Sequence, residues 1–210
     1  STTTVGNGGT AVYSQGGNVI INGGTLTVGA AEAVGVYYLG NGGTITNNAN
    51  AVNIGDTSFG FVNVGSGTTT LTSTTGNVNL GNDSVYIYST NASGTVTNST
   101  NLTASGSQNY GIRAQNLSNL GSDYYKYSFI NGSNGVIAVN GTNNVGASFS
   151  QYMTPDGSTD PIGNVSNLRI RLNGTNGVGI LRRADYLASQ NADMILTNAN
   201  VDLLEFDTAA

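Results

Sequence analysis

The segment VGVYYLGNGGTITNNANAVNIGDTSFGF (residues 34–61) decides the fold, because it begins with a five-residue word and ends inside the next copy of that word. The words VGVYY (34–38) and FGFVN (59–63) are related to five others in the chain: TAVYS (10–14), VYIYS (85–89), YGIRA (110–114), VGASF (145–149) and VGILR (178–182). The centres of successive words are 24, 25, 26, 25, 35 and 33 residues apart. Such near-constant spacing is the signature of a structural repeat.

Two further apolar columns recur between these words. One contains Leu26/Val28, Val52/Ile54, Val78/Leu80 and Leu102/Ala104, and the other contains Ile20, Ile45, Leu71 and Val96. Short apolar/polar alternation predicts strands, and the Gly and Asn clusters between them predict turns. The pattern therefore predicts an all-β fold, a right-handed parallel β-helix with three sides and about 25 residues per turn. An antiparallel meander is the alternative, but it would not need equivalent residues at a fixed spacing.

The spacing also predicts how the chain is divided. Residues 1–115 are expected to form regular turns of the solenoid. Residues 116–210 are expected to continue the same solenoid with longer turns, which carry loop insertions at about 117–129 and 150–164. The repeat is hard to follow through residues 183–210, and that tail receives no role.

The two-residue period of a strand predicts which side chains face inward. In the five-residue words, the residues on both sides of the centre are nearly all apolar, and we expect both to face the core: Thr10/Val12, Val34/Val36, Phe59/Phe61, Val85/Ile87, Tyr110/Ile112, Val145/Ala147 and Val178/Ile180. A neighbouring column should face outward: Tyr13, Tyr37, Val62, Tyr88 and Arg113. Its rings either stack between turns or offer a binding surface.

Composition excludes several classes of function. The chain has 6 basic and 11 acidic residues, a net charge of −5, so no basic patch is expected to bind nucleic acid. It contains no His and no Cys, which excludes Ser-His-Asp and Cys-His catalysis and zinc sites built on those residues. Hydrophobic residues make up 38% of the chain at regular intervals, which favours order over disorder.

The acidic residues favour a structural role. Asp56 and Asp83 lie at neighbouring repeat positions and could approach each other, as in a paired-carboxylate glycosidase, but solvated corners are the favoured interpretation. Asp156, Ser158 and Asp160 have the alternate spacing that begins a calcium loop. Because the Gly at position six and the acid at position twelve of that motif are missing, no metal and no cofactor are predicted.

The predicted insertions hold the candidate binding residues. One contains Tyr124, Tyr125, Lys126 and Tyr127, and the other contains Tyr152. Protruding loops on a repetitive scaffold often carry binding, and Tyr is favoured at energetically dominant contacts. Arg169 and Arg171 should project together from a strand, either as a protective charged ladder or as a contact for an anionic sugar or acidic peptide.

The words in residues 34–61 and 84–112 resemble the repeats of large autotransporter adhesin passengers, particularly the fusobacterial kind. The resemblance covers roughly residues 5–115. It implies a secreted passenger on the bacterial cell surface, attached to the outer membrane through a C-terminal barrel beyond these residues. The implied partners are a host cell-surface receptor or glycan, or a partner bacterium, bound by a monomer.

These observations together predict a non-catalytic segment of a cell-surface adhesin, acting as a rigid scaffold that displays loops for attachment. Two alternatives stay open. One is a β-helical enzyme that acts on polysaccharides, and the other is a phage tail-spike or trimeric autotransporter solenoid.

Overall fold

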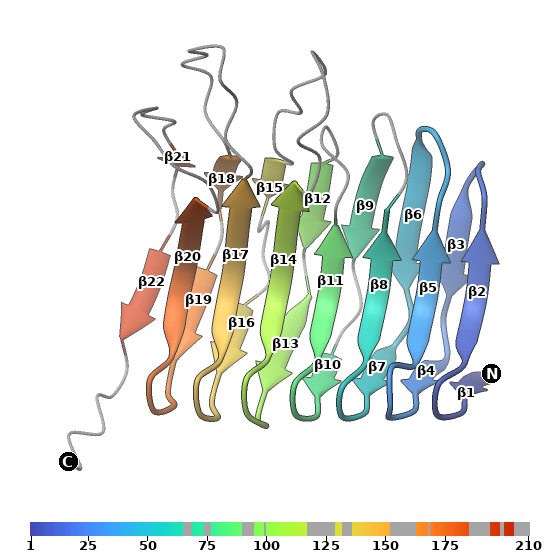
Figure 1. Ribbon diagram of the computed structural model, residues 1–210, viewed down its shortest axis with the longest axis horizontal. Coiled ribbons are helices and arrows are strands. Elements are labelled where there is room, and N and C mark those ends of the chain that lie inside the picture. The colour runs from blue at the N-terminus through green and yellow to red at the C-terminus, as the bar shows by residue number, and fades with distance from the viewer. Residues whose placement is uncertain are drawn as a thin grey trace.

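The computed structural model describes residues 1–64, 69–73, 77–89, 95–98, 100–116, 129–131, 136–151, 163–167, 169–184, 194–197 and 200–203. These residues form a solenoid of short strands in three sheets (Figure 1). Among them there is no helix with the length and hydropathy needed to span a membrane.

We call the three sheets A, B and C. Sheet A contains β1 (Thr2–Val5), β4 (Thr25–Val28), β7 (Ala51–Ile54), β10 (Asn77–Leu80), β13 (Asn101–Ala104), β16 (Val136–Val139), β19 (Arg169–Leu172) and β22 (Asn200–Leu203). Sheet B contains β2 (Thr10–Ser14), β5 (Val34–Tyr38), β8 (Phe59–Asn63), β11 (Val85–Ser89), β14 (Tyr110–Asn116), β17 (Val145–Gln151) and β20 (Val178–Ala184). Sheet C contains β3 (Val19–Asn22), β6 (Gly43–Asn48), β9 (Thr69–Ser73), β12 (Thr95–Asn98), β15 (Phe129–Asn131), β18 (Gly163–Ser166) and β21 (Met194–Thr197).

Every strand pairs in parallel with its counterpart one turn away, so the antiparallel alternative is wrong. In sheet A, for example, Leu26 pairs with Val52 and Val52 with Val78. The chain rises through sheet B at the front of Figure 1, descends behind through sheets C and A, and advances with a right-handed sense. The predicted three-sided parallel β-helix is confirmed. Its longer later turns are also confirmed, since Tyr110 pairs with Val145 and Val145 with Val178.

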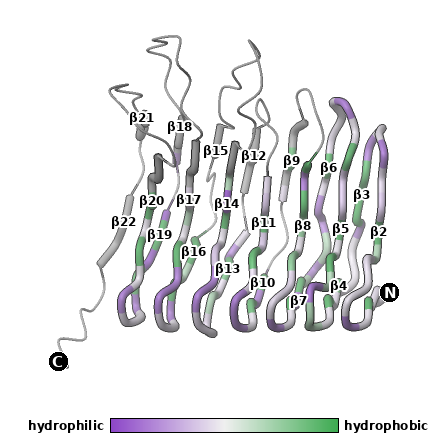
Figure 2. The backbone as a smooth tube through the Cα atoms, viewed as in Figure 1, coloured by the Kyte–Doolittle hydropathy of each residue, from purple (hydrophilic) through white to green (hydrophobic). Residues whose placement is uncertain are grey.

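The core is a set of stacked apolar columns. In sheet A the inward side chains Leu26, Val52, Val78, Leu102, Ile137 and Ile170 are almost fully buried. Sheet B contributes Val36, Phe61, Ile87, Ile112 and Ala147 to the same core. Apolar residues follow the strands in Figure 2, and hydrophilic residues gather in the corners between sheets A and B. Each turn thus buries its inner face against the turns above and below.

The prediction for the apolar column of Ile20, Ile45, Leu71 and Val96 is wrong at one residue. Ile20 is 57% exposed, and its neighbour Val19 takes the inward place, paired with Ile45. The cause lies in the corner between sheets B and C. Tyr38 pairs with Ser14, yet Ile45 follows Tyr38 by seven residues while Val19 follows Ser14 by five. The corner after Tyr38 is therefore two residues longer than the corner after Ser14. A constant step of 25 residues back from Ile45 points to Ile20, whereas the pairing places Val19 there.

The predicted orientation of sheet B is wrong for one of its two flanks. The residue after the centre is in the core. The residue before the centre, which is Phe59, Val85 or Tyr110 in three of the strands, lines a hollow on the outer side and belongs to no core cluster, although Val85 and Val145 at this position are themselves buried. The pairing of the strands explains this: Val85 pairs with Phe59 and Ile87 with Phe61, while the centre between them is left unpaired. The centre residue turns inward, so strict alternation is interrupted there.

The centre position is accordingly crowded. A Cβ atom on Gly60 would lie 2.6 Å from the carbonyl oxygen of Tyr86 and 2.8 Å from Cδ1 of Ile54. Where Tyr86 occupies the centre, its ring is fully buried and meets Phe61 edge-on, with 5.7 Å between the ring centroids. Its hydroxyl lies 2.5 Å from Oγ of Ser73 and accepts a hydrogen bond from Nδ2 of Asn47 at 3.0 Å.

A buried polar ladder follows the corners between sheets A and B. The backbone N–H of Ala33 donates to Oγ of Ser58, that of Ser58 to Oγ of Ser84, and that of Ser84 to Oδ1 of Asn109. The backbone N–H of Asn109 then donates to Oδ1 of Asn144 at 2.7 Å. Each corner therefore takes a hydrogen-bond acceptor from the next turn along the chain.

Candidate binding surface on the outer face of sheet B

The outward column predicted on sheet B is confirmed as a stack of equivalent residues. The ladder pairs Tyr13 with Tyr37, Tyr37 with Val62, Val62 with Tyr88 and Tyr88 with Arg113. At its start the rings of Tyr13 and Tyr37 are stacked, with centroids 5.8 Å apart and planes 9° from parallel. Tyr13 is 56% exposed, so the first ring of the stack faces solvent.

In the strands of sheet B, the residue before the centre of the five-residue word also lies on the outer side. These residues form a second outward column next to the column that runs from Tyr13 to Arg113. Phe59 pairs with Val85 and Val85 with Tyr110. The columns contact each other: the ring of Phe59 lies 6.0 Å from that of Tyr88, and the guanidinium of Arg113 lies 5.8 Å from the centre of the Tyr88 ring. Arg113 also lies 5.0 Å from the Tyr110 ring centre, within range of a cation–π interaction.

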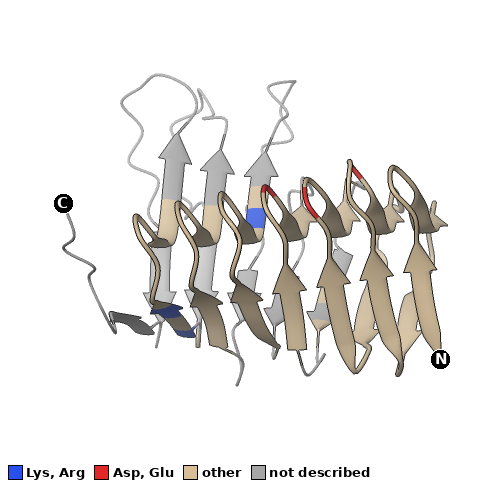
Figure 3. Cartoon of the chain, turned by 90° about the horizontal axis from the view of Figure 1, so that it is seen from below, with Lys and Arg blue, Asp and Glu red and all other residues tan. Residues whose placement is uncertain are grey.

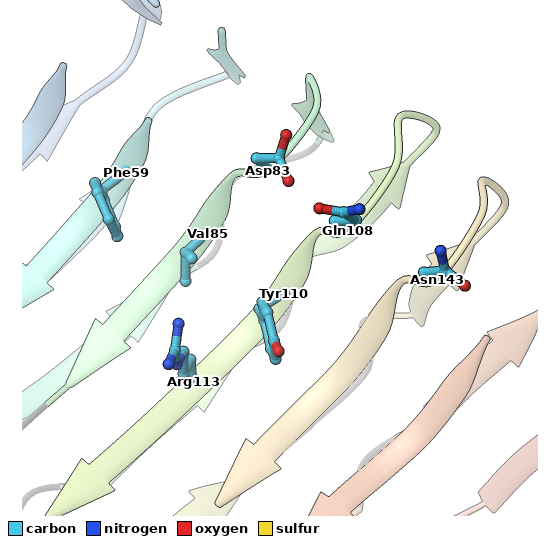
Figure 4. A pocket seen from close by; sticks show the side chains of 7 residues that line it. All are labelled: Phe59, Asp83, Val85, Gln108, Tyr110, Arg113 and Asn143. Carbon is cyan, nitrogen blue, oxygen red and sulfur yellow. The ribbon is translucent and has the colours of Figure 1, made fainter. Parts of the chain in front are cut away.

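A hollow of about 450 Å³ opens on this face. Its lining residues are Phe59, Val85 and Tyr110 from the flank column, Arg113 from the outer column, and Asp83, Gln108 and Asn143 from the adjoining corners (Figure 4). Val85 lies between Phe59 and Tyr110 in register and is only 4% exposed. The sequence predicted Arg113 to face outward and Asp83 to lie at a solvated corner, but it placed Phe59, Val85 and Tyr110 in the core. The only signal against that placement was the presence of Thr10 and Tyr110 in their column.

The corner residues of the hollow share an unusual backbone conformation. Asp83, Gln108 and Asn143 have φ values of 52°, 59° and 57°. This left-handed region suits Gly and is tolerated by Asn and Asp, but it is unfavourable for Gln. Each conformation is held by the next turn: the N–H of Asp83 donates to the carbonyl of Ser107, and that of Gln108 to the carbonyl of Thr142.

Charge is unevenly distributed around this face. Glu32, Asp56 and Asp83 lie in the corners between sheets A and B, and Arg113 lies on β14 of sheet B. Figure 3 shows the acidic residues along one row of corners. The pKa of Tyr88 is raised above its usual value because its hydroxyl is partly buried; the nearby Arg113 opposes this shift and Tyr37 adds to it. Tyr88 is therefore a neutral phenol at physiological pH.

Asp56 and Asp83 do not occupy equivalent positions. Asp56 is equivalent to Asn82, whose backbone N–H donates to Oδ1 of Asp56 at 2.8 Å, while Asp83 shares the left-handed position of Thr57. Asp56 thus stabilises a corner, and Asp83 alone lines the hollow. Within the described ranges, no three or more His, Cys, Asp or Glu residues are grouped as metal ligands.

The other predicted sites lie elsewhere. Arg169 is exposed on β19 of sheet A, and Arg171 is partly buried beside it. The candidate binding residues Tyr124, Tyr125, Lys126, Tyr127 and Tyr152 lie outside the described residues, as do Asp156, Ser158 and Asp160. Comparisons with models of protein families, with curated proteins and with solved structures found no match for this chain.

Proposed function

We propose that this chain is a non-catalytic segment of a bacterial cell-surface adhesin passenger, which acts as a rigid scaffold and displays contact surfaces for attachment. The observation that carries the proposal is the unbroken parallel pairing of the three sheets. A solenoid whose every turn is hydrogen-bonded to its neighbours resists bending and presents side faces at regular intervals. Such a rod suits a protein that must hold a binding surface away from a cell.

The proposed partners are a host cell-surface receptor or glycan, or a partner bacterium. The chain would bind them as a monomer on the outer bacterial surface. The contact surfaces are the outer face of sheet B and the segments that contain Tyr124, Tyr125, Lys126 and Tyr127, and Tyr152. The aromatic and charged residues of sheet B support this, because rings on a rigid support make contacts at low entropic cost.

Attachment of beads coated with the purified chain to host epithelial cells and to other bacteria tests this function. We expect attachment above that of beads coated with an unrelated solenoid. The triple variant Tyr124→Ser, Tyr125→Ser, Tyr127→Ser is expected to reduce it, and unchanged attachment would exclude that segment as a contact. Absence of attachment to every cell type in the panel would count against the adhesin function as a whole.

A second candidate is a β-helical enzyme that acts on polysaccharides, favoured by the single observation that Asp83 lines the hollow. This alternative predicts turnover of neutral or uronate glycans that is lost in Asp83→Asn and kept in Asp56→Asn. No turnover across a panel of polysaccharides would reject it.

A further inference from the structure

We propose that Asn41 is a site of spontaneous covalent modification, which converts to aspartate and isoaspartate through a succinimide formed with the backbone nitrogen of Gly42. This inference is independent of the proposed attachment function. It rests on the hydrogen bonds that separate this Asn-Gly pair from others in the chain, and on the position of its corner beside a core residue.

An Asn followed by Gly can modify itself because Gly has no Cβ atom to hinder its own backbone nitrogen. That nitrogen attacks Cγ of the Asn side chain, and the side-chain amide leaves as ammonia. Water then opens the five-membered ring. Cleavage of the bond to Cγ gives aspartate, and cleavage of the bond to the backbone carbonyl carbon gives isoaspartate, whose main chain runs through Cγ. Each event consumes one water and releases one ammonia.

The described ranges contain several Asn-Gly pairs, and exposure does not distinguish them. Their Asn residues are all exposed: Asn7, Asn22, Asn41, Asn140, Asn173 and Asn176. The reaction requires a free attacking nitrogen and a side chain that can turn toward it. Hydrogen bonds to the neighbouring turns, which must open before attack, therefore decide which pair reacts.

The pairs Asn7–Gly8 and Asn22–Gly23 are held at both reacting groups. Oδ1 of Asn7 accepts from the N–H of Ala30 at 3.0 Å, and the N–H of Gly8 donates to the carbonyl of Ala30 at 3.1 Å. Oδ1 of Asn22 accepts from Nδ2 of Asn48 at 3.2 Å, and the N–H of Gly23 donates to the carbonyl of Asn48 at 3.1 Å. Attack in either pair requires both hydrogen bonds to open first.

The pair Asn140–Gly141 is held in the same way. Oδ1 of Asn140 accepts from Nδ2 of Asn173 at 2.8 Å, and the N–H of Gly141 donates to the carbonyl of Ala104 at 3.1 Å. The first of these bonds also holds the side-chain amide of Asn173. Three Asn-Gly pairs are thus protected at both the attacking nitrogen and the side chain that it would attack.

The pair Asn41–Gly42 lacks this protection. In the part of the chain that the structure describes, neither the side chain of Asn41 nor the N–H of Gly42 forms a hydrogen bond. The carbonyl of Gly42 accepts from the hydroxyl of Tyr38, but it lies beyond Cα from the attacking nitrogen and can keep that bond during attack. Within the same ranges Asn176–Gly177 shares the lack of these bonds, so it is the second pair expected to react.

Modification of Asn41 would reach the core through Tyr38. This ring is fully buried, and its hydroxyl contacts the carbonyl oxygens of Gly17, 2.9 Å away, and Gly42. A Cβ atom on Gly43 would lie 2.5 Å from that hydroxyl oxygen, so the backbone packs closely around it. Isoaspartate adds one carbon to the main chain directly before Gly42. We expect the longer chain to displace the Gly42 carbonyl from Tyr38, whereas aspartate keeps the backbone and should leave the contact intact.

Peptide mapping by mass spectrometry, during incubation of the folded chain at mildly alkaline pH, tests the site. We expect conversion at Asn41 at least tenfold faster than at Asn7, Asn22 and Asn140. In denaturant, where the protecting hydrogen bonds are absent, these four residues should convert at similar rates. Conversion of Asn7 or Asn22 as fast as Asn41 in the folded chain, or a tenfold preference for Asn41 that persists in denaturant, would overturn the proposal.

The variants Asn41→Gln and Asn22→Gln form a matched pair that tests the effect on the core. Gln would have to close a six-membered ring and reacts far more slowly. After incubation, the wild type and Asn22→Gln should show a lower midpoint of thermal denaturation, while Asn41→Gln keeps its starting value. Freshly purified Asn41→Asp should match the fresh wild type, because it has the added charge with a normal backbone. An equal loss in incubated Asn41→Gln, or a destabilised fresh Asn41→Asp, would overturn the link between isoaspartate and Tyr38.

Discussion

The backbone N–H of Ser84 donates a hydrogen bond of 2.8 Å to Oδ1 of Asn109, one turn further along the chain, and both residues are fully buried. Nδ2 of Asn109 in turn donates to the carbonyl of Gly81 at 2.6 Å. One side chain thus satisfies a donor and an acceptor of the preceding corner. Corners of a solenoid lack the regular ladder of a sheet, and a buried amide takes its place.

Asn109→Ala should therefore destabilise the protein by about 2–4 kcal/mol, since it leaves the buried N–H of Ser84 and the partly buried carbonyl of Gly81 without their partners. Chemical denaturation followed by circular dichroism measures the loss. The matched control is Asn79→Ala, because Asn79 donates to Oδ1 of Asn53 at 3.0 Å in an exposed ladder. That change should cost less than about 0.5 kcal/mol. Equal losses of stability in the two variants would show that the buried ladder stabilises the protein no more than the exposed ladder does.

Gly60→Ala should destabilise the protein by about 1–3 kcal/mol, because the added methyl group overpacks the core against the Tyr86 carbonyl and Ile54. Gly16→Ala is the control, since a Cβ atom there meets nothing within 4 Å. Its effect should be neutral or slightly stabilising. Thermal denaturation of the two variants compares them directly, and a tolerated Gly60→Ala would contradict the inward orientation of the centre position.

Tyr86→Phe should cost about 1–3 kcal/mol, because it removes a buried hydroxyl that contacts Ser73 and Asn47 while leaving the ring in place. Tyr13→Phe removes a hydroxyl from an exposed ring and should have almost no effect. Urea denaturation of both variants distinguishes the buried polar cluster from the surface. A neutral Tyr86→Phe would mean that the cluster repacks without its phenol.

The raised pKa of Tyr88 predicts a loss of stability in alkali. Below pH of about 10, Tyr88 is neutral in both the folded and the unfolded chain, so its ionisation has no effect on folding. As the pH rises through about 10, the unfolded chain loses this proton before the folded one, and the free energy of unfolding falls. Tyr88→Phe should show a shallower decline than the wild type when denaturation is followed from pH 8 to about 11. Identical slopes would show that Tyr88 titrates alike in both states.

The sequence by itself determined the period, the three strands per turn and the residues that stack in sheet A, because each turn repeats the same apolar pattern for the same core. Leu26, Val52 and Val78 follow from spacing alone. It also identified the outward column from Tyr13 to Arg113, since these residues are equivalent in every regular turn.

Only the tertiary structure decided where the repeat departs from constant spacing and from strict alternation of inward and outward side chains. The two extra residues after Tyr38 moved Val19 into the place expected for Ile20, because corner length is set by how the chain crosses from one sheet to the next. The unpaired centre of each strand in sheet B turned Phe59, Val85 and Tyr110 outward, because an interrupted ladder breaks the alternation on which sequence reasoning depends. These three residues line the hollow because they lie on the outer side of sheet B, where Val85 itself is buried beneath its neighbours.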